Sequence, residues 1–219
     1  MVKIISIEGN IGSGKSTIVQ YLKKYYGDKY IFVQEPVQEW NTICDENGET
    51  ILSHFYRDNK QYSFQFQMMA YISRLNVLME IIKKNPNAII ITERCLFTDK
   101  HVFAKMLYDT NNMTQIEYTI YNKWFSCFID NITIDGIIYI YTQPDICEKR
   151  IIHRNRKGEN IPLQYLNACH EYHNNWLGKS KIPITRYNGN VDIDTNNIND
   201  IIQELDLCIQ KIINSTSNI

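Results

Sequence analysis

The chain of 219 residues carries 23 basic and 24 acidic side chains, a net charge of −1, and 44% of its residues are hydrophobic. This composition is typical of one folded domain with a sizeable core. It disfavours a disordered chain, and it disfavours a general nucleic-acid-binding surface, which is usually strongly basic. The longest apolar runs have about six or seven residues, far short of the ~20 that a membrane-spanning helix needs.

The start of the chain and its cysteines bear on the compartment. The sequence opens on a strand-like run without the hydrophobic or Arg-rich segment of a targeting peptide, so we expect a cytoplasmic protein. The six cysteines are widely spaced and include no Cys-x-x-Cys pair, which favours reduced thiols over a disulfide framework or a zinc site. His170 and His173 lie close together in one expected helix, but no third ligand accompanies them, so we expect no metal there.

Strand-like and helix-like segments alternate along the chain. Five β-rich segments are expected strands, and the first four are almost continuously apolar, as in strands buried on both faces of a parallel sheet. They span residues 3–8, 30–35, 88–93, 136–142 and 191–194. Apolar periodicity predicts helices over 16–26, 62–84, 115–130, 145–156, 163–176 and 199–213, and a turn is expected at 45–48. The alternation predicts a three-layer α/β domain with a central five-stranded parallel sheet over residues 1–213, and a frayed tail at 214–219.

The first expected strand leads into a glycine-rich motif. Residues 9–17 match the phosphate-binding pattern G-x-x-x-x-G-K-[ST] and lie between a strand and a helix, as this P-loop motif requires. Its glycines allow backbone N–H groups to face a polyphosphate at a helix N-terminus, while Lys15 reaches the β- and γ-phosphates and Ser16 binds Mg²⁺. The expected donor-binding residues are Gly9, Asn10, Ile11, Gly12, Ser13, Gly14, Lys15, Ser16 and Thr17. The alternative is a glycine-rich turn that binds nothing.

Two carboxylates stand at the carboxyl ends of expected strands. Glu35 ends the second strand and Glu93 ends the third. In open α/β sheets this edge is where ligands bind, so both side chains are expected beside the phosphate site. The alternative for each carboxylate alone is an ordinary surface position at a strand terminus.

The long helix expected at 62–84 carries polar side chains among apolar ones. Gln67, Ala70 and Arg74 fall on one face of it. A buried polar group must find a partner, and a Gln amide offers both a donor and an acceptor, as pairing with a nucleobase edge requires. The alternative is a bond between the Gln67 amide and the backbone inside the core.

Further short motifs follow in order along the chain. They are Ser6–Ile11, Glu35-Pro36-Val37 with Trp40, Phe64–Gln67, Glu93-Arg94, Asp99, Arg150, Arg154-x-Arg156 and Ile161-Pro162-Leu163. Together they resemble the deoxyribonucleoside kinases, which include deoxycytidine, deoxyguanosine and mitochondrial thymidine kinases. The resemblance covers roughly residues 3–176. One departure is Glu93-Arg94-Cys95, where the family usually has Glu-Arg-Ser.

The resemblance implies a P-loop kinase fold and a reaction. A γ-phosphoryl group would pass from ATP or another nucleoside triphosphate to the 5′-hydroxyl of a deoxynucleoside. Glu35 is then the expected general base, because the family's base lies in this Glu-Pro-Val motif, and Arg94 orients Glu35 and the 5′-oxygen. Glu93 is expected to hold Mg²⁺ together with Ser16, and Lys15 remains on the phosphates.

The helix after Pro144 carries a basic end. Arg150 and Arg154 lie one turn apart, with Arg156 close by, and such like charges repel slightly until a polyphosphate binds between them. The resemblance assigns them to an Arg-rich lid at about residues 150–161, in which Glu159 contacts the sugar. The alternative is a solvated basic helix end.

The resemblance also implies an acceptor pocket. In the family the Gln67 position reads the base, Arg74 with Asp99 marks the deoxycytidine and deoxyguanosine branch, and Tyr56 contacts the 3′-hydroxyl. The expected acceptor-binding residues are Glu35, Val37, Trp40, Leu52, Phe55, Tyr56, Phe66, Gln67, Ala70, Arg74, Arg94, Asp99, Phe103 and Glu159, with Ile11 as a further wall.

Two other functions remain open from the sequence. A nucleoside monophosphate kinase, such as a thymidylate kinase, shares a P-loop and a lid, but it usually has Asp-Arg in place of Gln34-Glu35-Pro36 after the second strand. A non-catalytic nucleotide-binding module is disfavoured because the whole set of charged motif residues is present. The resemblance further implies a homodimer, for which the helices at 62–84 and 115–130 are apolar enough to supply a face.

Overall fold

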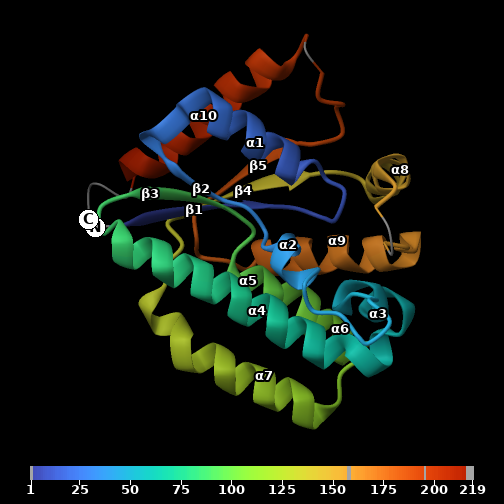
Figure 1. Cartoon of the computed structure of the whole chain (residues 1–219). Helices are drawn as coiled ribbons and strands as arrows, with labels where there is room; N and C mark the ends of the chain where they lie inside the picture. The colour runs from blue at the N-terminus through green and yellow to red at the C-terminus, as the bar shows by residue number, and fades with distance from the viewer. Residues whose placement is uncertain (1, 157–158, 195, 216–219) are drawn as a thin grey trace.

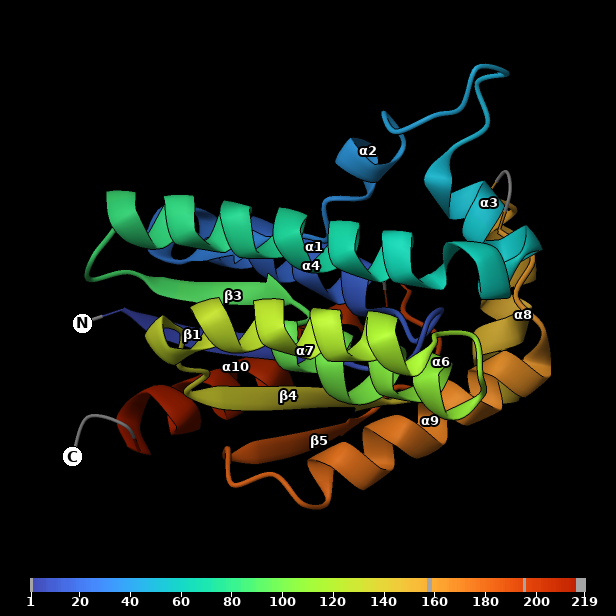
Figure 2. The same ribbon diagram turned by 90° about the horizontal axis from the view of Figure 1, so that it is seen from below.

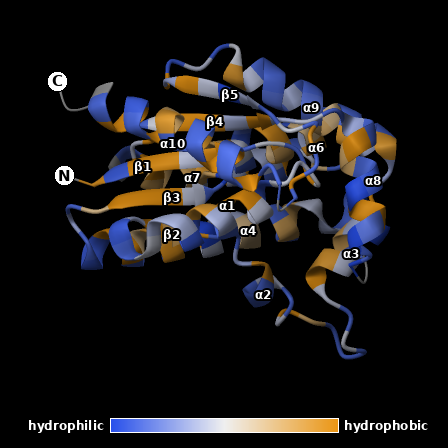
Figure 3. Ribbon diagram, turned by 90° about the horizontal axis from the view of Figure 1, so that it is seen from above, coloured by the Kyte–Doolittle hydropathy of each residue, from blue (hydrophilic) through white to orange (hydrophobic). Residues whose placement is uncertain are grey.

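The sheet has five parallel strands in the order β2-β3-β1-β4-β5. In the computed structural model, which describes residues 2–156, 159–194 and 196–215, they are β1 (Lys3–Glu8), β2 (Ile31–Val33), β3 (Ile89–Glu93), β4 (Gly136–Tyr141) and β5 (Ile184–Asn188). The central β1 pairs with β3 from Lys3↔Ile89 and with β4 from Ile5↔Gly136. Hydrophobic residues dominate the central strands (Figure 3), which agrees with burial on both faces.

Two helices cover one face of the sheet. They are α1 (Lys15–Tyr26), which begins inside the P-loop, and α10 (Ile198–Ser215) (Figure 1). Odd-numbered residues of β1 face this layer, because side chains alternate along a strand. Ile5 and Ile7 are fully buried there against Ile18, Leu22 and residues of α10.

The other face carries more helices, in two tiers. The inner tier has α4 (Asn59–Lys84), α5 (Leu96–Thr98), the π-helical segment η2 (Asp99–Ala104), α6 (Lys105–Asp109) and α9 (Leu163–Leu177). The outer tier is α7 (Gln115–Phe128), which lies along α4 on the side away from the sheet (Figures 1 and 2). A capping box between Thr114 and Glu117 starts α7. The predicted three-layer α/β architecture is therefore confirmed.

Three helices lie toward the carboxyl ends of the strands: α2 (Val37–Trp40), α3 (Ile51–Arg57) and α8 (Pro144–Arg154). The side chains of Thr50 and Asp58 accept hydrogen bonds from backbone N–H groups in the first turns of α3 and α4, so each helix has a defined start. Short helical segments η1 (Gly27–Lys29) and η3 (Ile129–Asn131) follow α1 and α7. No helix in the described ranges is long and apolar enough to cross a membrane.

The last strand and the end of the chain differ from the prediction. Residues 191–194 form no strand, and the fifth strand is β5 at Ile184–Asn188. β5 is an edge strand that pairs with β4 alone; Pro183 precedes it and Arg186 interrupts it, so it lacks the continuous apolar run of a central strand. The short helices α2, α3, α5 and α6 were also not predicted. Helix α10 continues to Ser215 into the expected tail, whose residues 216–219 lie outside the described residues.

Candidate active site

A cavity of 1380 Å³ opens at the carboxyl edge of the sheet. The P-loop after β1, the segment after β2 and the end of β3 meet there, with α2, α3, α4 and α8 around them. All fourteen predicted acceptor-binding residues line this cavity, as do Lys15, Ser16, Arg150, Arg154 and Arg156. Ile11, Gly12, Gly14 and Thr17 of the P-loop line it too, whereas Gly9, Asn10 and Ser13 are buried and do not. Most of the predicted donor residues therefore share one continuous space with the acceptor residues.

The P-loop has the backbone geometry that its glycines permit. Gly9, Gly12 and Gly14 have φ angles of 153°, 78° and 96°, in the region that disfavours other residues. A Cβ on Gly12 would lie 2.6 Å from the carbonyl oxygen of Cys147 in α8, so the loop packs directly against the helix that bears the lid arginines. A side chain at position 12 would push the two elements apart.

Lys15 is buried inside the loop. Its Nζ donates to the carbonyl oxygen of Asn10 at 2.6 Å and lies 3.4 Å from Ser13 Oγ. Burial, together with the nearby Arg94, lowers the pKa of Lys15 to about 8, although Glu93 and Glu35 oppose the shift. A polyphosphate bound in the loop would place a negatively charged partner beside the Lys15 ammonium group.

Ser16 and Glu93 provide a pair of oxygen ligands. Ser16 Oγ donates to Glu93 Oε1 at 2.5 Å, from the first turn of α1 to the end of β3. A hydroxyl and a carboxylate oxygen are the donor types that Mg²⁺ prefers, and a magnesium ion usually takes few protein ligands beside substrate phosphates. These two residues therefore fit the predicted magnesium site.

Glu35 is held by two arginines. Arg94 NH1 donates to Glu35 Oε1 at 2.5 Å, and Arg74 NH2 donates to the same oxygen at 2.9 Å. Burial alone would raise the pKa of the Glu35 carboxyl, but the guanidinium groups of Arg94 and Arg74 lower it to about 2. The predicted contact between Arg94 and Glu35 is present, whereas the contact from Arg74 was not foreseen.

Arg74 also forms the predicted pair with Asp99. Arg74 Nε donates to Asp99 Oδ2 at 2.9 Å, and its NH1 donates to the carbonyl oxygen of Glu93 at 2.8 Å. Both side chains are buried. Burial raises the pKa of Asp99 to about 6, with Arg74 opposing that shift. The guanidinium group of Arg74 therefore binds three partners in the site: the Asp99 side chain, the Glu93 carbonyl oxygen and the Glu35 side chain.

Aromatic side chains form the far wall of the cavity. Phe66 of α4 stacks on Phe55 of α3 at a centroid distance of 4.5 Å and meets Trp40 edge-to-face at 5.5 Å. Trp40 Nε1 donates to Ser73 Oγ at 2.9 Å, which fixes α2 against α4. The wall therefore has the flat apolar surfaces that accommodate a ring system.

Gln67 projects into this apolar region. The residue is 2% exposed and lines the cavity. Within the part of the chain that the structure describes, its amide makes no hydrogen bond. Among the described residues the Gln67 amide therefore has no backbone partner in the core, and it is available to a ligand.

The lid arginines have different partners. Arg154 Nε donates to Glu159 Oε2 at 2.9 Å, and its NH2 donates to Oε1, a bidentate pair. Arg150 is fixed by the carbonyl oxygens of Gly189 and Val191 and by Asp192. Arg156 lines the cavity. Residues 157 and 158 of the predicted lid lie outside the described residues.

Several cavity residues were not predicted. They are Gln20, Gln34, Gln38, Asn41, Ile146, Lys149, His153, Tyr165, Asn190, Asp192 and Ile193, with Pro36 inside the Glu-Pro-Val motif. The 190–193 group was missed because we expected a strand there. Pairing of β5 with β4 would have indicated its position, since the segment after β5 then reaches the same edge as the P-loop.

Comparisons with known proteins identify one family. Residues 5–210 match the family model described as deoxynucleoside kinase. A probable deoxycytidine kinase of Fowlpox virus (strain NVSL) is 39% identical, with 93% of this chain and 89% of that protein covered. The deoxycytidine kinase of Homo sapiens is 35% identical, with 80% and 75% covered. The mitochondrial deoxyguanosine kinase of Xenopus laevis is 32% identical, with 84% and 76% covered.

Proposed function

The chain belongs to the deoxynucleoside kinase family, and we propose that it transfers the γ-phosphoryl group of ATP to the 5′-hydroxyl of deoxycytidine and of at least one purine deoxynucleoside. The observation that carries this proposal is the position of Glu35. Arg94 and Arg74 hold its carboxylate between the P-loop and the aromatic wall. A hydroxyl bound there lies within reach of a base and faces a phosphoryl donor in the P-loop.

On the donor side, the P-loop N–H groups and Lys15 bind the phosphates. Ser16 and Glu93 would hold Mg²⁺, which when bound neutralises charge on the β- and γ-phosphates. Arg154 and Arg156 meet the charge that develops on the transferring group, and Arg150 fixes the segment that follows β5. Closure of the basic residues over the phosphates excludes water from the reaction.

On the acceptor side, Arg94 positions Glu35, and Glu35 Oε1 or Oε2 accepts the proton of the 5′-hydroxyl. The two arginines make Glu35 a weak base before substrate binds. Phosphoryl transfer through a loose transition state demands little of the nucleophile, so a positioned carboxylate that takes the proton late is sufficient. Positioning, more than basicity, is then its main contribution.

The base and sugar contacts follow from the pocket. The free Gln67 amide pairs with the base edge, and the Arg74–Asp99 pair offers a fixed donor and acceptor beside it. This arrangement suits the exocyclic groups of cytosine or a purine and crowds the 5-methyl group of thymine. Tyr56 and Glu159 contact the 3′-hydroxyl. The names of the relatives, deoxycytidine and deoxyguanosine kinases, support the same choice of substrates.

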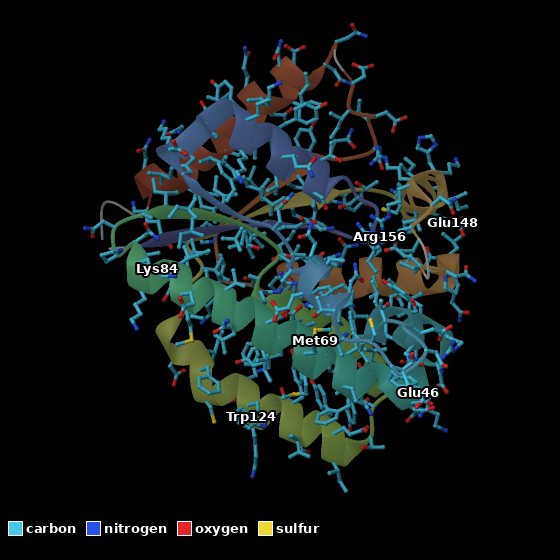
Figure 4. The ribbon with its side chains drawn as sticks, viewed as in Figure 1. Glu46, Met69, Lys84, Trp124, Glu148 and Arg156 are labelled. Carbon is cyan, nitrogen blue, oxygen red and sulfur yellow. The ribbon has the colours of Figure 1, made fainter. Side chains whose placement is uncertain are left out.

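We also propose a homodimer through α4 and α7. Ile72 and Met79 of α4 are 48% and 47% exposed, and Ile116 and Trp124 of α7 are 73% and 47% exposed. Figure 4 shows Trp124 on α7, in the layer farthest from the sheet. A large exposed apolar face of this kind is typical of a protein–protein contact, and light scattering after gel filtration, with Trp124→Lys as the variant, measures its effect on mass.

A coupled ADP-release assay tests the function. Each deoxynucleoside and each nucleoside monophosphate is offered with ATP and Mg²⁺, and Glu35→Gln protein prepared in the same way controls for contaminating kinases. We expect turnover with deoxycytidine and with deoxyguanosine or deoxyadenosine, and poorer turnover with thymidine. Turnover confined to monophosphates would contradict the proposal; the relatives disfavour that outcome and also disfavour a non-catalytic module.

A further inference from the structure

Glu8 is a buried carboxyl group that the proposed reaction does not use. It is the last residue of β1, it is fully buried, and the P-loop begins at the next residue. Ser6 Oγ donates to Glu8 Oε1 at 2.5 Å, and Thr98 Oγ1 donates to Glu8 Oε2 at 2.6 Å. Burying a carboxyl group is costly unless its oxygens are hydrogen-bonded, so these two hydroxyls define where it can lie.

Thr98 belongs to the segment between two site residues, Arg94 and Asp99. Hydrogen bonds attach the segment to β1: Arg94 N donates to the carbonyl oxygen of Ile7 at 3.0 Å, the Thr98 hydroxyl donates to Glu8, and the Cys95 thiol also lies against Glu8. Arg94 has a φ of 61°, a left-handed conformation that a residue other than glycine keeps only when its surroundings enforce it. The hydrogen bonds to β1 hold Arg94 in this conformation.

Both groups that hold Glu35 depend on this segment. Arg94 at its start donates directly to Glu35, and Asp99 at its end binds Arg74, which donates to the same oxygen of Glu35. A shift of the segment would therefore move the two guanidinium groups together. Misplacing a reacting group by about 1 Å can cost about 10²-fold in rate.

We propose that Glu8 is a positioning residue for phosphoryl transfer: through the Thr98 hydroxyl it fixes the 94–99 segment relative to the P-loop that follows it, and so keeps Glu35 aligned with the donor. The proposal rests on the proposed roles of Glu35 and Arg94. In this proposal the buried carboxyl group of Glu8 links the donor half of the site to the acceptor half.

Ser6 provides the matched control. Its hydroxyl donates to the other oxygen of the same carboxyl group, but Ser6 lies on β1 itself, upstream of Glu8, and is equally buried. Ser6→Ala and Thr98→Val each remove one buried hydroxyl from Glu8. Only Thr98→Val cuts the link to the 94–99 segment, and valine keeps the shape of threonine. Removal of Glu8 itself is the less useful test, because loss of a buried network can unfold the protein.

The experiment measures kcat, the KM for deoxycytidine, the KM for ATP and the unfolding midpoint. For Thr98→Val we expect kcat to fall about 10- to 100-fold with an unchanged KM for ATP, whereas Ser6→Ala keeps kcat within about twofold. Both variants should lose similar thermal stability, since each leaves one carboxyl oxygen without a donor. Thr98→Ser restores the hydroxyl and should restore kcat.

Equal losses of kcat in Thr98→Val and Ser6→Ala, or a Thr98→Ser variant as impaired as Thr98→Val, would overturn the proposal. Wild-type protein that phosphorylates no deoxynucleoside would instead contradict the proposed function. In that case a crystal structure of Thr98→Val still tests the positioning role of Glu8. We expect Arg94 and Asp99 to be displaced from their wild-type positions, and unchanged positions would refute that role.

Discussion

Arg74 NH2 and Glu35 Oε1 lie 2.9 Å apart, so the helix that carries the expected base-reading residues is bonded directly to the expected proton acceptor. Arg74 is on α4, about one turn beyond Ala70 and about two turns beyond Gln67, while Glu35 follows β2. If Gln67 and Glu35 have the roles proposed above, a change in how α4 meets the nucleobase is transmitted to the group that meets the 5′-hydroxyl. The proposed function therefore predicts that substrate choice and rate are linked through the guanidinium group of Arg74.

Glu35→Gln should nearly abolish turnover while ATP binding survives. The amide keeps the shape of the carboxylate but cannot take a proton, and it forms no ion pair with Arg94 or Arg74. Loss of a general base typically lowers the rate about 10²–10⁴-fold. Steady-state kinetics with deoxycytidine and titration of ATP binding check both parts. A variant that keeps more than half of the wild-type kcat would remove Glu35 from the mechanism.

The pH profile of the reaction should lack an acid limb that arises from free Glu35. Because Arg94 and Arg74 lower the pKa of Glu35 to about 2, its carboxyl is ionised throughout the pH range well above that value. Arg74→Met removes one of the two cations, so the pKa of Glu35 rises and an acid limb in kcat/KM moves toward neutral pH. Lys84→Met, at the exposed end of the same helix, is the control. Identical acid limbs in all three proteins would contradict this electrostatic account.

The ligand-free protein should become more stable as the pH rises through the pKa of Lys15. Burial lowers this pKa from 10.5 to about 8, so between these values the unfolded chain binds more protons than the folded one, and the free energy of unfolding increases with pH. The shift corresponds to about 2–4 kcal/mol across that window. Urea unfolding of wild type and Lys15→Met at pH 7 and pH 10 measures it, because other groups titrate alike in both. A wild-type–variant difference that does not change with pH would refute the shift.

Arg154→Ala and Arg156→Ala should depress kcat more than deoxynucleoside affinity. Both side chains line the cavity on the side of α8, and the charge they meet is greatest in the transition state, so their contribution is differential. Arg154 must also leave its bidentate pair with Glu159 before it can reach a phosphate. The two variants are compared by kcat and by equilibrium binding of deoxycytidine. An unchanged kcat with weaker deoxycytidine binding would contradict the lid assignment.

Much of the fold was predictable because the three central strands, β1, β3 and β4, are almost entirely buried. Continuous apolar runs such as 3–8 and 136–142 are typical of central strands in a parallel sheet. The edge strand β5 has three polar residues among its five, Thr185, Arg186 and Asn188, and the misplaced expectation at 191–194 followed from that weaker signal. Short helices such as α3 were missed because a few residues carry too little periodicity.

The candidate site was predictable to the level of which side chains meet, but not of how they bond. Parallel strands send their carboxyl ends to one edge, so the P-loop and Glu93 had to converge there. The second bond from Arg74 to Glu35 could not be foreseen, because it depends on how α4 crosses the end of β2. The Arg154–Glu159 pair likewise depends on the fold of the lid, and nothing in local sequence distinguishes it from two solvated charges.

The double variant Arg74→Met with Asp99→Ala should shift substrate choice toward thymidine. The buried pair lines the same cavity as Gln67. In the proposed binding mode it crowds the 5-methyl group of thymine, and removal of both side chains would leave an apolar gap there. Each single variant leaves one buried charge unpaired, which is costly, so the effects should not add. Because Arg74 also holds Glu35, kcat falls for every substrate, and the ratio of kcat/KM for thymidine to that for deoxycytidine is the quantity to compare.

Wild type that prefers thymidine over every other deoxynucleoside would show this view of the α4 face to be wrong. Single effects on the ratio that simply add would mean that the pair acts as two independent residues, even with the kinase assignment intact.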